Sequence, residues 1–414
     1  MGRRIFIIGV CPGLAFGGEA KKRLAESDVI LASRRILDDL SNYGSSPEDF
    51  TKFSSKVKAI DKIDETVSFL RGFTSGKVSV LASGDPLFFG IGRILTAEFS
   101  QEEVKIYPAV SSMQLAFAKI GMPWEDAFFV SLHGAKKRHW QPEDLPLLAG
   151  IYGKLLILTG GKGRRPADIA PYLPGHAKVF VFERLGYPDE TVTRTTSKGL
   201  LKKNFREPNL IIAEASPRPR GVLEREDISF GLGEDEFEHD GLITKDEARA
   251  VLIHKLRLPR EGVLWDIGAG SGSVGIEAKR LSPGLNIYAV EKDRRRAARI
   301  AKNCQKLSAG AINIIEGEAP KILAGLPAPQ RVVIGGGGGR LSDIIKAVSA
   351  VMDKGIVVVS AITLESIADT VHFLKEEGFA KIDAVSVAAS RMEPLKDRNF
   401  MKALNPVFII RGQK

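Results

Sequence analysis

Short apolar runs alternate with helical patterns along almost the whole of the 414-residue chain. The alternation is most regular in the second half, where the predicted strands are GVLWDIGAG, NIYAVEKD, AINIIEG, QRVVIGG and GIVVVSA. Strands that alternate with helices favour a parallel sheet covered by helices. We therefore predict an α/β protein with a Rossmann-like C-terminal domain. Two further strands, IDAVSVAAS and NPVFIIRG, have no helix between them and predict a closing antiparallel pair.

The first half shows the same alternation. RRIFIIGV, KVSVLAS, KLLILTG, KVFVFERLG and NLIIAEA are predicted strands, separated by helical patterns. We expect an α/β body whose strands are largely parallel. Residues 216–241, rich in Pro, Gly and acidic side chains, follow it and are typical of an interdomain connection. The predicted domains are residues 1–213 and 241–414, joined by an acidic linker, 214–240.

Charge follows the same division. The net charge is +7 over residues 1–213, −6 over 214–240 and +9 over 241–414. Basic domains attract polyanions, which could be nucleic acid or a small molecule with many carboxylates, although a solvated surface explains the charge equally well.

The positions of cysteine, histidine and apolar residues argue against a disulfide-rich, metal-binding or membrane-spanning protein. Two distant cysteines make no disulfide framework, and the scattered histidines have no metal-ligand spacing, so we expect no metal. No apolar stretch approaches the ~20 residues of a membrane-spanning helix, and the N-terminal apolar run is too short for a signal peptide. We expect a cytoplasmic protein.

WDIGAGSGSVGIE, residues 265–277, is the strongest local motif. An apolar strand ends in Asp266, after which Gly268, Gly270 and Gly272 alternate and a helix begins. Such glycines permit a tight turn and let a ligand approach the backbone. A carboxylate just before the first glycine disfavours a pyrophosphate but suits the ammonium of a methionine group. The motif therefore favours S-adenosylmethionine (SAM) over NAD.

The ends of the next two strands support this interpretation. Glu291 ends NIYAVEKD, where an acidic side chain accepts hydrogen bonds from ribose hydroxyls. Glu318 and Ala319, in the GEAP segment that follows AINIIEG, fall where the adenine edge is expected.

Other motifs follow strands of the first half. GVCPG begins at Gly9, and in SGDPLFFGIG the Gly-Asp-Pro turn presents Asp85 and backbone amides into a cleft. In PAVSS, Ser111 and Ser112 precede a helix and can act as N-caps.

Together the motifs resemble two known families. GVCPG, SGDPLFFG, PAVSS, SLHG and ERLG, within residues 1–213, resemble the tetrapyrrole (corrin/porphyrin) methylases of the CbiE type. LITKDEAR, DIGAGSGSVGIE, GEAP, IGGGGG and NPVFII, within residues 241–412, resemble the CbiT type. The resemblance implies a tetrapyrrole-methylase fold of two α/β subdomains, followed by a Rossmann-like class I SAM methyltransferase fold.

The resemblance also implies a function and a set of contacts. The first half would methylate C5 of a polycarboxylated corrin precursor on the route to cobalamin. The second half would methylate C15 and decarboxylate the C12 acetate. Each half is implied to bind its own SAM. The implied SAM-binding residues of the first half are Gly9, Pro12, Gly13, Gly84, Asp85, Ser111 and Ser112. Those of the second half are Thr244, Asp266, Gly268, Ala269, Gly270, Ser271, Gly272, Glu291, Glu318 and Ala319.

Two positions depart from the families' usual motifs. Cys11 stands where a glycine is usual, which would narrow the turn around the methionine end of SAM. Glu318 stands where aspartate is common and keeps the acid one methylene longer.

Catalysis needs little more than alignment, because the bridging carbons of a reduced tetrapyrrole are enamine-like and already nucleophilic. The candidate catalytic residues are Asp85, His133, Lys245 and Arg249. Substrate carboxylates could be clamped by Lys136, Lys137, Arg138, Lys162, Arg164, Arg165, Lys245, Arg249, Arg391 and Arg398. Residues 294–296, three arginines after Glu291, are expected to be solvated.

Two alternative functions stay open, an RNA-modifying methyltransferase and a non-catalytic corrinoid carrier. No basic strand pair interleaved with aromatic residues is present to stack bases, so we expect no nucleic-acid partner. We also expect no membrane partner, and the resemblance suggests a homo-oligomer, either a dimer or a tetramer.

Overall fold

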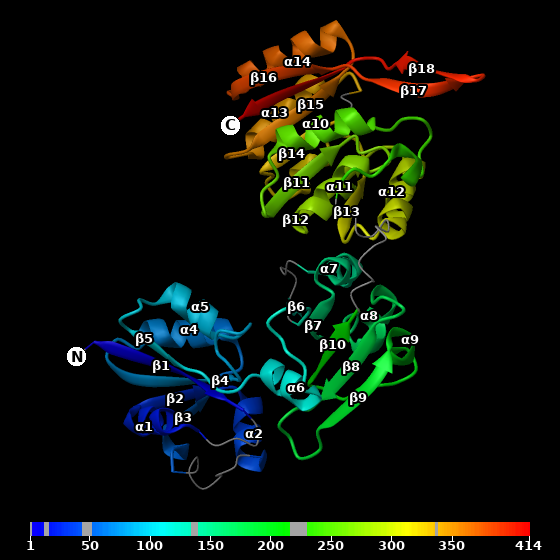
Figure 1. The fold of residues 1–414 in the computed structure, drawn as a ribbon. Helices are drawn as coiled ribbons and strands as arrows, with labels where there is room; N and C mark the ends of the chain where they lie inside the picture. Colours follow the sequence, from blue (N-terminus) through cyan, green and yellow to red (C-terminus); the bar gives the residue numbers. More distant parts are fainter. Residues whose placement is uncertain (1, 12–15, 44–51, 134–139, 216–229, 336–337) are drawn as a thin grey trace. The chain divides into compact units, whose positions relative to one another are not determined.

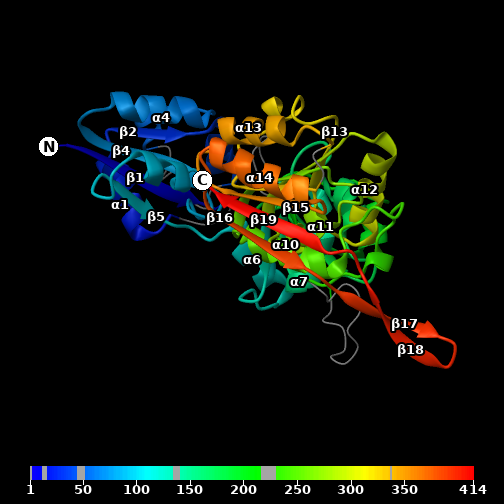
Figure 2. The same ribbon diagram turned by 90° about the horizontal axis from the view of Figure 1, so that it is seen from above.

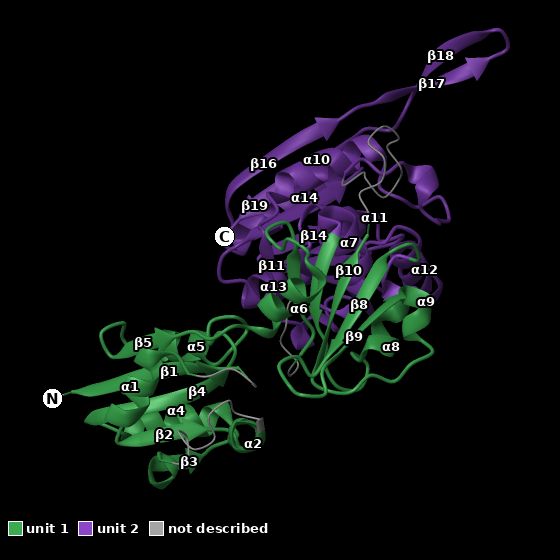
Figure 3. Ribbon diagram, turned by 60° about the horizontal axis from the view of Figure 1, so that its bottom comes forward, with its two compact units in different colours: residues 1–133, 154–171, 175–216 green, residues 134–153, 172–174, 217–414 purple. Residues whose placement is uncertain are grey.

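The computed structural model describes residues 2–11, 16–43, 52–133, 140–215, 230–335 and 338–414 (Figure 1). They form two compact units, coloured separately in Figure 3. The first unit is drawn from residues 1–133, 154–171 and 175–216, and the second from residues 134–153, 172–174 and 217–414. No helix in the described ranges is long and apolar enough to cross a membrane.

The first sheet of the first unit is wholly parallel. In sheet order its strands are β3 (Val57–Ala59), β2 (Val29–Ala32), β4 (Gly76–Ser83), β1 (Arg3–Val10) and β5 (Val104–Tyr107). Helices α1 (Gly18–Glu26) and α2 (Arg34–Tyr43) pack against the face that carries Phe6 and Ile8. Helices α4 (Ile63–Gly72) and α5 (Gly92–Glu98) pack against Ile5 and Ile7. Because both faces are covered, β1 is apolar at consecutive positions.

The second sheet of this unit is mostly antiparallel. Its order is β6 (Phe128–Ser131), β7 (Lys154–Leu158), β10 (Asn209–Glu214), β8 (Lys178–Glu183) and β9 (Thr191–Thr196). Only β6 and β7 are parallel, so the expectation of largely parallel strands is right for the first sheet and wrong for the second. One reason is that residues 184–190 alone join β8 to β9, too few for the crossover that a parallel pair needs.

Short helices complete the first unit. They are α6 (Ser112–Ile120), α8 (Pro166–Ile169) and α9 (Ser197–Leu200). Met113 and Phe117 of α6 pack against the second sheet, on Leu156 and Phe182.

The second unit contains a seven-stranded sheet. Its order is β13 (Ile312–Glu316), β12 (Gly284–Glu291), β11 (Glu261–Ile267), β14 (Arg331–Ile334), β15 (Ile356–Ala361), β19 (Val407–Gln413) and β16 (Ala380–Val387). The predicted antiparallel pairing of the last two strands is confirmed as β16–β19. The sequence did not predict the hairpin between them, β17 (Ser390–Leu395) and β18 (Arg398–Ala403), which projects beyond the sheet in Figures 1 and 2.

Helices cover both faces of this sheet. They are α10 (Asp246–Leu256), α11 (Ser273–Leu281), α12 (Arg294–Lys306), α13 (Leu341–Val351) and α14 (Leu364–Glu376). Along β11 alternate side chains enter different layers. Leu264 packs with α10 and α11, whereas Trp265 packs with α13. Asp266 therefore shares the face of Leu264 and lies under α11.

Helix α7 (Leu145–Tyr152) also belongs to the second unit. Asp144, just before it, lies 3.1 Å from the Lys279 ammonium of α11 and accepts a hydrogen bond from Ala311 N. Both charged side chains are almost fully buried, so this ion pair fixes the start of α7 in the core of the second unit.

Candidate functional site

The glycine turn after β11 has a backbone conformation that residues other than glycine rarely adopt. Gly268, Gly270 and Gly272 have φ of +73°, +58° and +78°, in the left-handed region that favours glycine. Gly268 N and Ala269 N both donate to the carbonyl of Val290, at 2.9 and 3.1 Å. The turn is therefore a rigid stretch of bare backbone tied to the end of β12.

Glu291 joins three strand ends at this turn. Its buried carboxylate accepts from Gly270 N at 2.8 Å and from Asp293 N at 3.0 Å, while its carbonyl accepts from Gly317 N at 3.0 Å. Ala319 is buried just beyond Gly317. The structure thus brings the predicted ribose and adenine positions to the glycine turn.

Glu318 has a different environment from Ala319. Its side chain is exposed and forms an ion pair with Arg340 at 3.3 Å. Its expected contact with SAM stays a prediction.

Asp266 links the end of β11 to helix α11, which follows the glycine turn. Its buried carboxyl accepts from Gly275 N at 3.1 Å, near the start of α11. Burial raises the pKa of Asp266 to about 7, and the nearby charge of Glu291 acts in the same direction. The structure assigns Asp266 a role in holding α11 against β11, and its contact with a methionine ammonium stays a prediction.

This raised pKa predicts a pH dependence of stability. Above its ordinary pKa of about 4, Asp266 would ionise in the unfolded chain, whereas the folded protein keeps the proton up to about pH 7. The folded state then binds more protons, so unfolding free energy falls by roughly 1 kcal/mol per pH unit between pH 5 and 7. Asp168 and Asp240, whose pKa arginine partners lower to about 2, are ionised in both states in this window.

The measurement is urea unfolding of the ligand-free protein, followed by fluorescence of the buried Trp265 in a background where Trp124 and Trp140 are replaced by Phe. Asp266→Asn is the control, because an amide cannot ionise. Its stability should fall less steeply with pH than that of the wild type. Equal slopes would contradict the assignment.

Residues 230–245, which we call the strap, lie against the glycine turn. Gly231 N and Leu232 N donate to Glu277 of α11 at 2.9 and 2.6 Å. Asn303 of α12 donates to Glu238 O at 3.0 Å and to Ser271 O at 2.9 Å, so one amide side chain holds both the strap and the turn.

Acidic residues of the strap pair with the second unit. Asp240 lies 3.0 Å from Arg296 and 3.2 Å from Arg299. The expectation that Arg296 is merely solvated is therefore wrong. The only sequence signal for these contacts was the run of acidic residues, which we interpreted as a linker.

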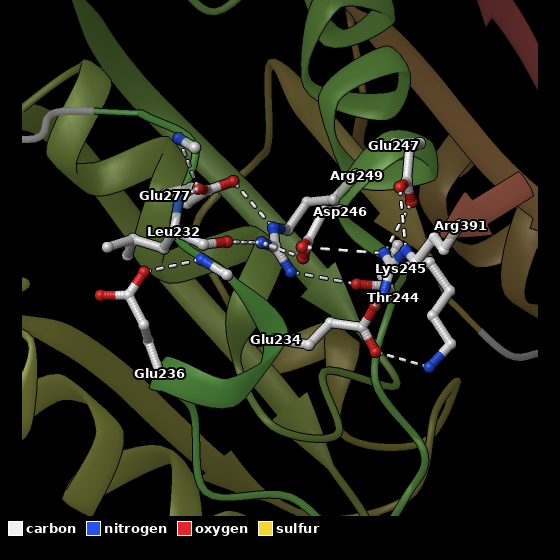
Figure 4. A network of polar contacts seen from close by, with 12 residues as sticks. Leu232, Glu234, Glu236, Thr244, Lys245, Asp246, Glu247, Arg249, Glu277 and Arg391 are labelled. Carbon is white, nitrogen blue, oxygen red and sulfur yellow. Dashed lines mark hydrogen bonds and ion pairs between the residues drawn. The ribbon is translucent and has the colours of Figure 1, made fainter. Parts of the chain in front are cut away.

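The three cations near Thr244 bind the protein's own carboxylates (Figure 4). The Arg249 side chain is 1% exposed, donates to Glu277 at 2.8 Å, and also donates to Thr244 O at 3.0 Å. Lys245 pairs with Glu234 of the strap. Burial leaves Arg249 no free surface for a substrate, so its expected catalytic or clamping role is replaced by a structural one.

Arg391 reaches the same network from β17. Its guanidinium lies 2.7 Å from both Glu247 and Glu234 (Figure 4). It therefore ties the base of the hairpin to α10 and the strap. Arg398, on β18, is exposed.

In the first unit, three strand ends meet without room for side chains. A Cβ on Gly9 would lie 2.2 Å from Gly84 O and 2.4 Å from Ala109 N. Gly84 has φ +62°, donates to Val10 O at 2.7 Å, and a Cβ on it would lie 3.1 Å from Ser111 Cα. The structure thus brings Gly9, Gly84 and Ser111 together. Pro12 and Gly13 lie outside the described residues.

The polar side chains here mainly shape the backbone. Asp85 accepts from Leu87 N at 2.8 Å, which makes the expected rigid turn. The N-cap role predicted for Ser111 is confirmed, because its hydroxyl accepts from Gln114 N at 3.3 Å. Ser112 is the first residue of α6.

The remaining candidate residues of the first half have other contacts or lie outside the described residues. His133 is exposed, and among the described residues no hydrogen bond or ion pair is found between it and Asp85. Arg164 donates to Leu132 O at 3.2 Å, and Arg165 pairs with Asp168 at 2.9 Å. Lys162 is exposed. Three proposed clamps fall outside the described residues, Lys136, Lys137 and Arg138.

Comparisons with known proteins match both halves of the chain. Residues 4–201 match the tetrapyrrole (corrin/porphyrin) methylases, and residues 235–414 match a precorrin methyltransferase domain. A precorrin-6Y C(5,15)-methyltransferase [decarboxylating] of a Sinorhizobium species is 32% identical over 356 residues, 84% of this chain and 82% of that protein.

Two further matches each cover less than half of this chain. A probable cobalt-precorrin-6B C(15)-methyltransferase (decarboxylating) of Pyrobaculum calidifontis is 39% identical over 184 residues, 44% of this chain and 94% of that protein. A solved precorrin-6y C5,15-methyltransferase structure from Geobacter metallireducens is 39% identical, with a TM-score of 0.43, and covers 45% of this chain and 98% of that chain.

Proposed function

Because the chain belongs to the decarboxylating precorrin-6Y C5,15-methyltransferases, we propose that each half binds one SAM and methylates a different carbon of one precorrin. The protein is a SAM-dependent methyltransferase of cobalamin biosynthesis. In the proposal, the first half methylates C5, and the second half methylates C15 and removes the C12 acetate carboxyl group.

The observation that carries this proposal is the presence of two separate glycine turns, one in each unit. At each turn the strand ends pack backbone against backbone: a Cβ on Gly9 would lie 2.2 Å from Gly84 O, and one on Gly335 would lie 3.2 Å from Gly268 O. The second turn also has the Glu291 carboxylate, whose lone pairs suit ribose hydroxyls. Bare backbone beside an acid fits an adenosyl sulfonium, which supports a SAM site there.

Methyl transfer in this enzyme depends on positioning. SAM, when bound, supplies a methyl group on a positively charged sulfur. The turns and Glu291 would hold the donor in one orientation, and the bridging carbon of the precorrin attacks in line. That carbon is enamine-like, so alignment provides most of the catalysis and no strong base is required.

Decarboxylation uses the same electron-rich ring. Loss of CO₂ from the C12 acetate leaves an electron pair that the conjugated macrocycle accepts. The protein's part is to hold the carboxylate and to deliver a proton to the resulting carbon. Lys245, in the second half, remains a candidate for holding the carboxylate, and Asp85 and His133 remain candidates for the first half.

The proposal extends to the setting of the enzyme. We place it in the cytoplasm, without a nucleic-acid partner, as a homo-oligomer. The hairpin β17–β18 supports self-association, because its apolar side chains are exposed: Met392, Leu395, Phe400 and Met401.

Calorimetric titration of the full chain with SAM tests the two-site proposal. We expect two SAM molecules bound per chain. A stoichiometry of one would contradict it. Glu291→Ala, which removes the carboxylate of the second turn, should lower the stoichiometry to one and so show which turn binds the lost SAM.

A further inference from the structure

The turn after β4 presents two apolar side chains to solvent, one on each side of the half-buried Phe88. Leu87 is 52% exposed and Phe89 is 41% exposed. Phe88, between them, packs against the core of the second sheet, with its ring centroid 5.5 Å from that of Phe129 and 4.8 Å from that of Phe89. The Gly84–Asp85 turn of the predicted SAM site continues directly into this exposed pair.

Phe89 is held in an unfavourable backbone conformation. Its φ is +54°, a region in which an aromatic residue is rare and glycine is favoured. The neighbouring backbone is closely packed, because Gly92 N donates to Pro86 O at 2.9 Å and a Cβ on Gly90 or Gly92 would lie 2.5 or 2.6 Å from the same oxygen. Phe88 anchors the turn from the other side. Strain that holds an exposed aromatic ring beside a binding turn points to a function for the ring.

An exposed cation lies at the start of the same turn. Arg35 donates to Ser83 Oγ at 2.8 Å, so its guanidinium lies at the end of β4, directly before Gly84. The side chain is otherwise exposed, and its fork geometry suits a carboxylate.

We infer that Leu87, Phe89 and Arg35 recognise the corrin precursor at the C5 site, Leu87 and Phe89 contacting the flat apolar ring and Arg35 a peripheral carboxylate. This inference rests on the proposed function, since it assumes that the first unit methylates C5. The three residues position the substrate rather than the donor. Their contribution should therefore appear in the KM for the precursor and leave SAM binding intact.

The test uses the full chain, SAM with a ¹³C-labelled methyl group, and a reduced precorrin, with NMR reporting the labelled carbon at C5. Phe89→Ala and Leu87→Ala should each raise the KM for C5 methylation about tenfold. Phe89→Leu, which keeps an apolar side chain, should recover most of the loss. Arg35→Gln should raise the same KM, and the effect should shrink as salt is added, because salt screens the charge pair.

Controls separate this role from folding and from failure of the proposed function. Leu201→Ala removes a side chain of similar exposure, 59%, from the end of α9 and should leave the KM unchanged. Phe89→Asn tolerates the positive φ but lacks the ring. If it kept the wild-type KM, Phe89 would be structural only and the inference would be overturned. A wild-type enzyme that placed no label at C5 would instead contradict the proposed function.

Discussion

Replacing Glu291 with Ala is expected to remove SAM from the second unit and to abolish C15 methylation. The carboxylate holds Gly270 N and Asp293 N and, in the proposal, accepts both ribose hydroxyls. Hydrogen bonds to a charged group contribute ~1.5–3 kcal/mol each, so two of them correspond to roughly 10²- to 10⁴-fold in SAM affinity. C5 methylation depends on the other turn and should persist.

Glu316→Ala is the matched control for this variant. Glu316 pairs with Glu291 in the β12–β13 register but is exposed at its own strand end. Its removal should change neither methylation. If Glu291→Ala reduced C5 and C15 methylation equally while the protein stayed folded, the two sites would not be separate.

The largest effect on stability is expected for Glu277→Gln. Glu277 and Arg249 form an ion pair at 2.8 Å, and both side chains are 1% exposed. Removing one partner of a buried pair destabilises a protein by about 3–5 kcal/mol. Arg249 would keep only the Asp246 carboxylate, at 3.0 Å, so we expect the lower end of this range. Glu277 also accepts both strap amides through Oε1, and glutamine keeps one such acceptor, so the variant removes the charge and leaves the strap its hydrogen bonds.

Urea unfolding measures this loss in the second unit when it is followed by fluorescence of Trp265 in a background where Trp124 and Trp140 are replaced by Phe. The control is Glu393→Gln, which breaks an exposed pair with Lys402 in the same unit, where the side chains are 43% and 55% exposed. That change should lower the free energy of unfolding by less than about 1 kcal/mol. Equal midpoints for the two variants would contradict the role assigned to the Arg249–Glu277 pair.

Features encoded by neighbouring residues were predicted well. The glycine turn at 268–272 is local, since strand, glycines and helix follow one another, and each lies where the sequence placed it. The capping role of Ser111 is local in the same sense. In contrast, the direction of β10 depends on pairing with β7 and β8, and nothing within its own sequence specifies that direction.

Features that depend on distant partners were missed. The strap bonds to Glu277, which lies more than 40 residues along the chain, so its acidic residues resembled a solvated linker. Arg249 resembled a substrate clamp for the same reason, because the sequence does not show which cation meets which carboxylate. The conformation of Phe89 runs against the preference of its own residue type and could not be inferred from that type.

The mass of the product tests the central claim most directly. Purified full-length protein, incubated with SAM and a reduced precorrin, should yield a corrin with two methyl groups gained and one CO₂ lost. A product that carried a single new methyl group, or kept its C12 acetate carboxyl after both methylations, would contradict an enzyme with two transfer sites and a decarboxylating second half.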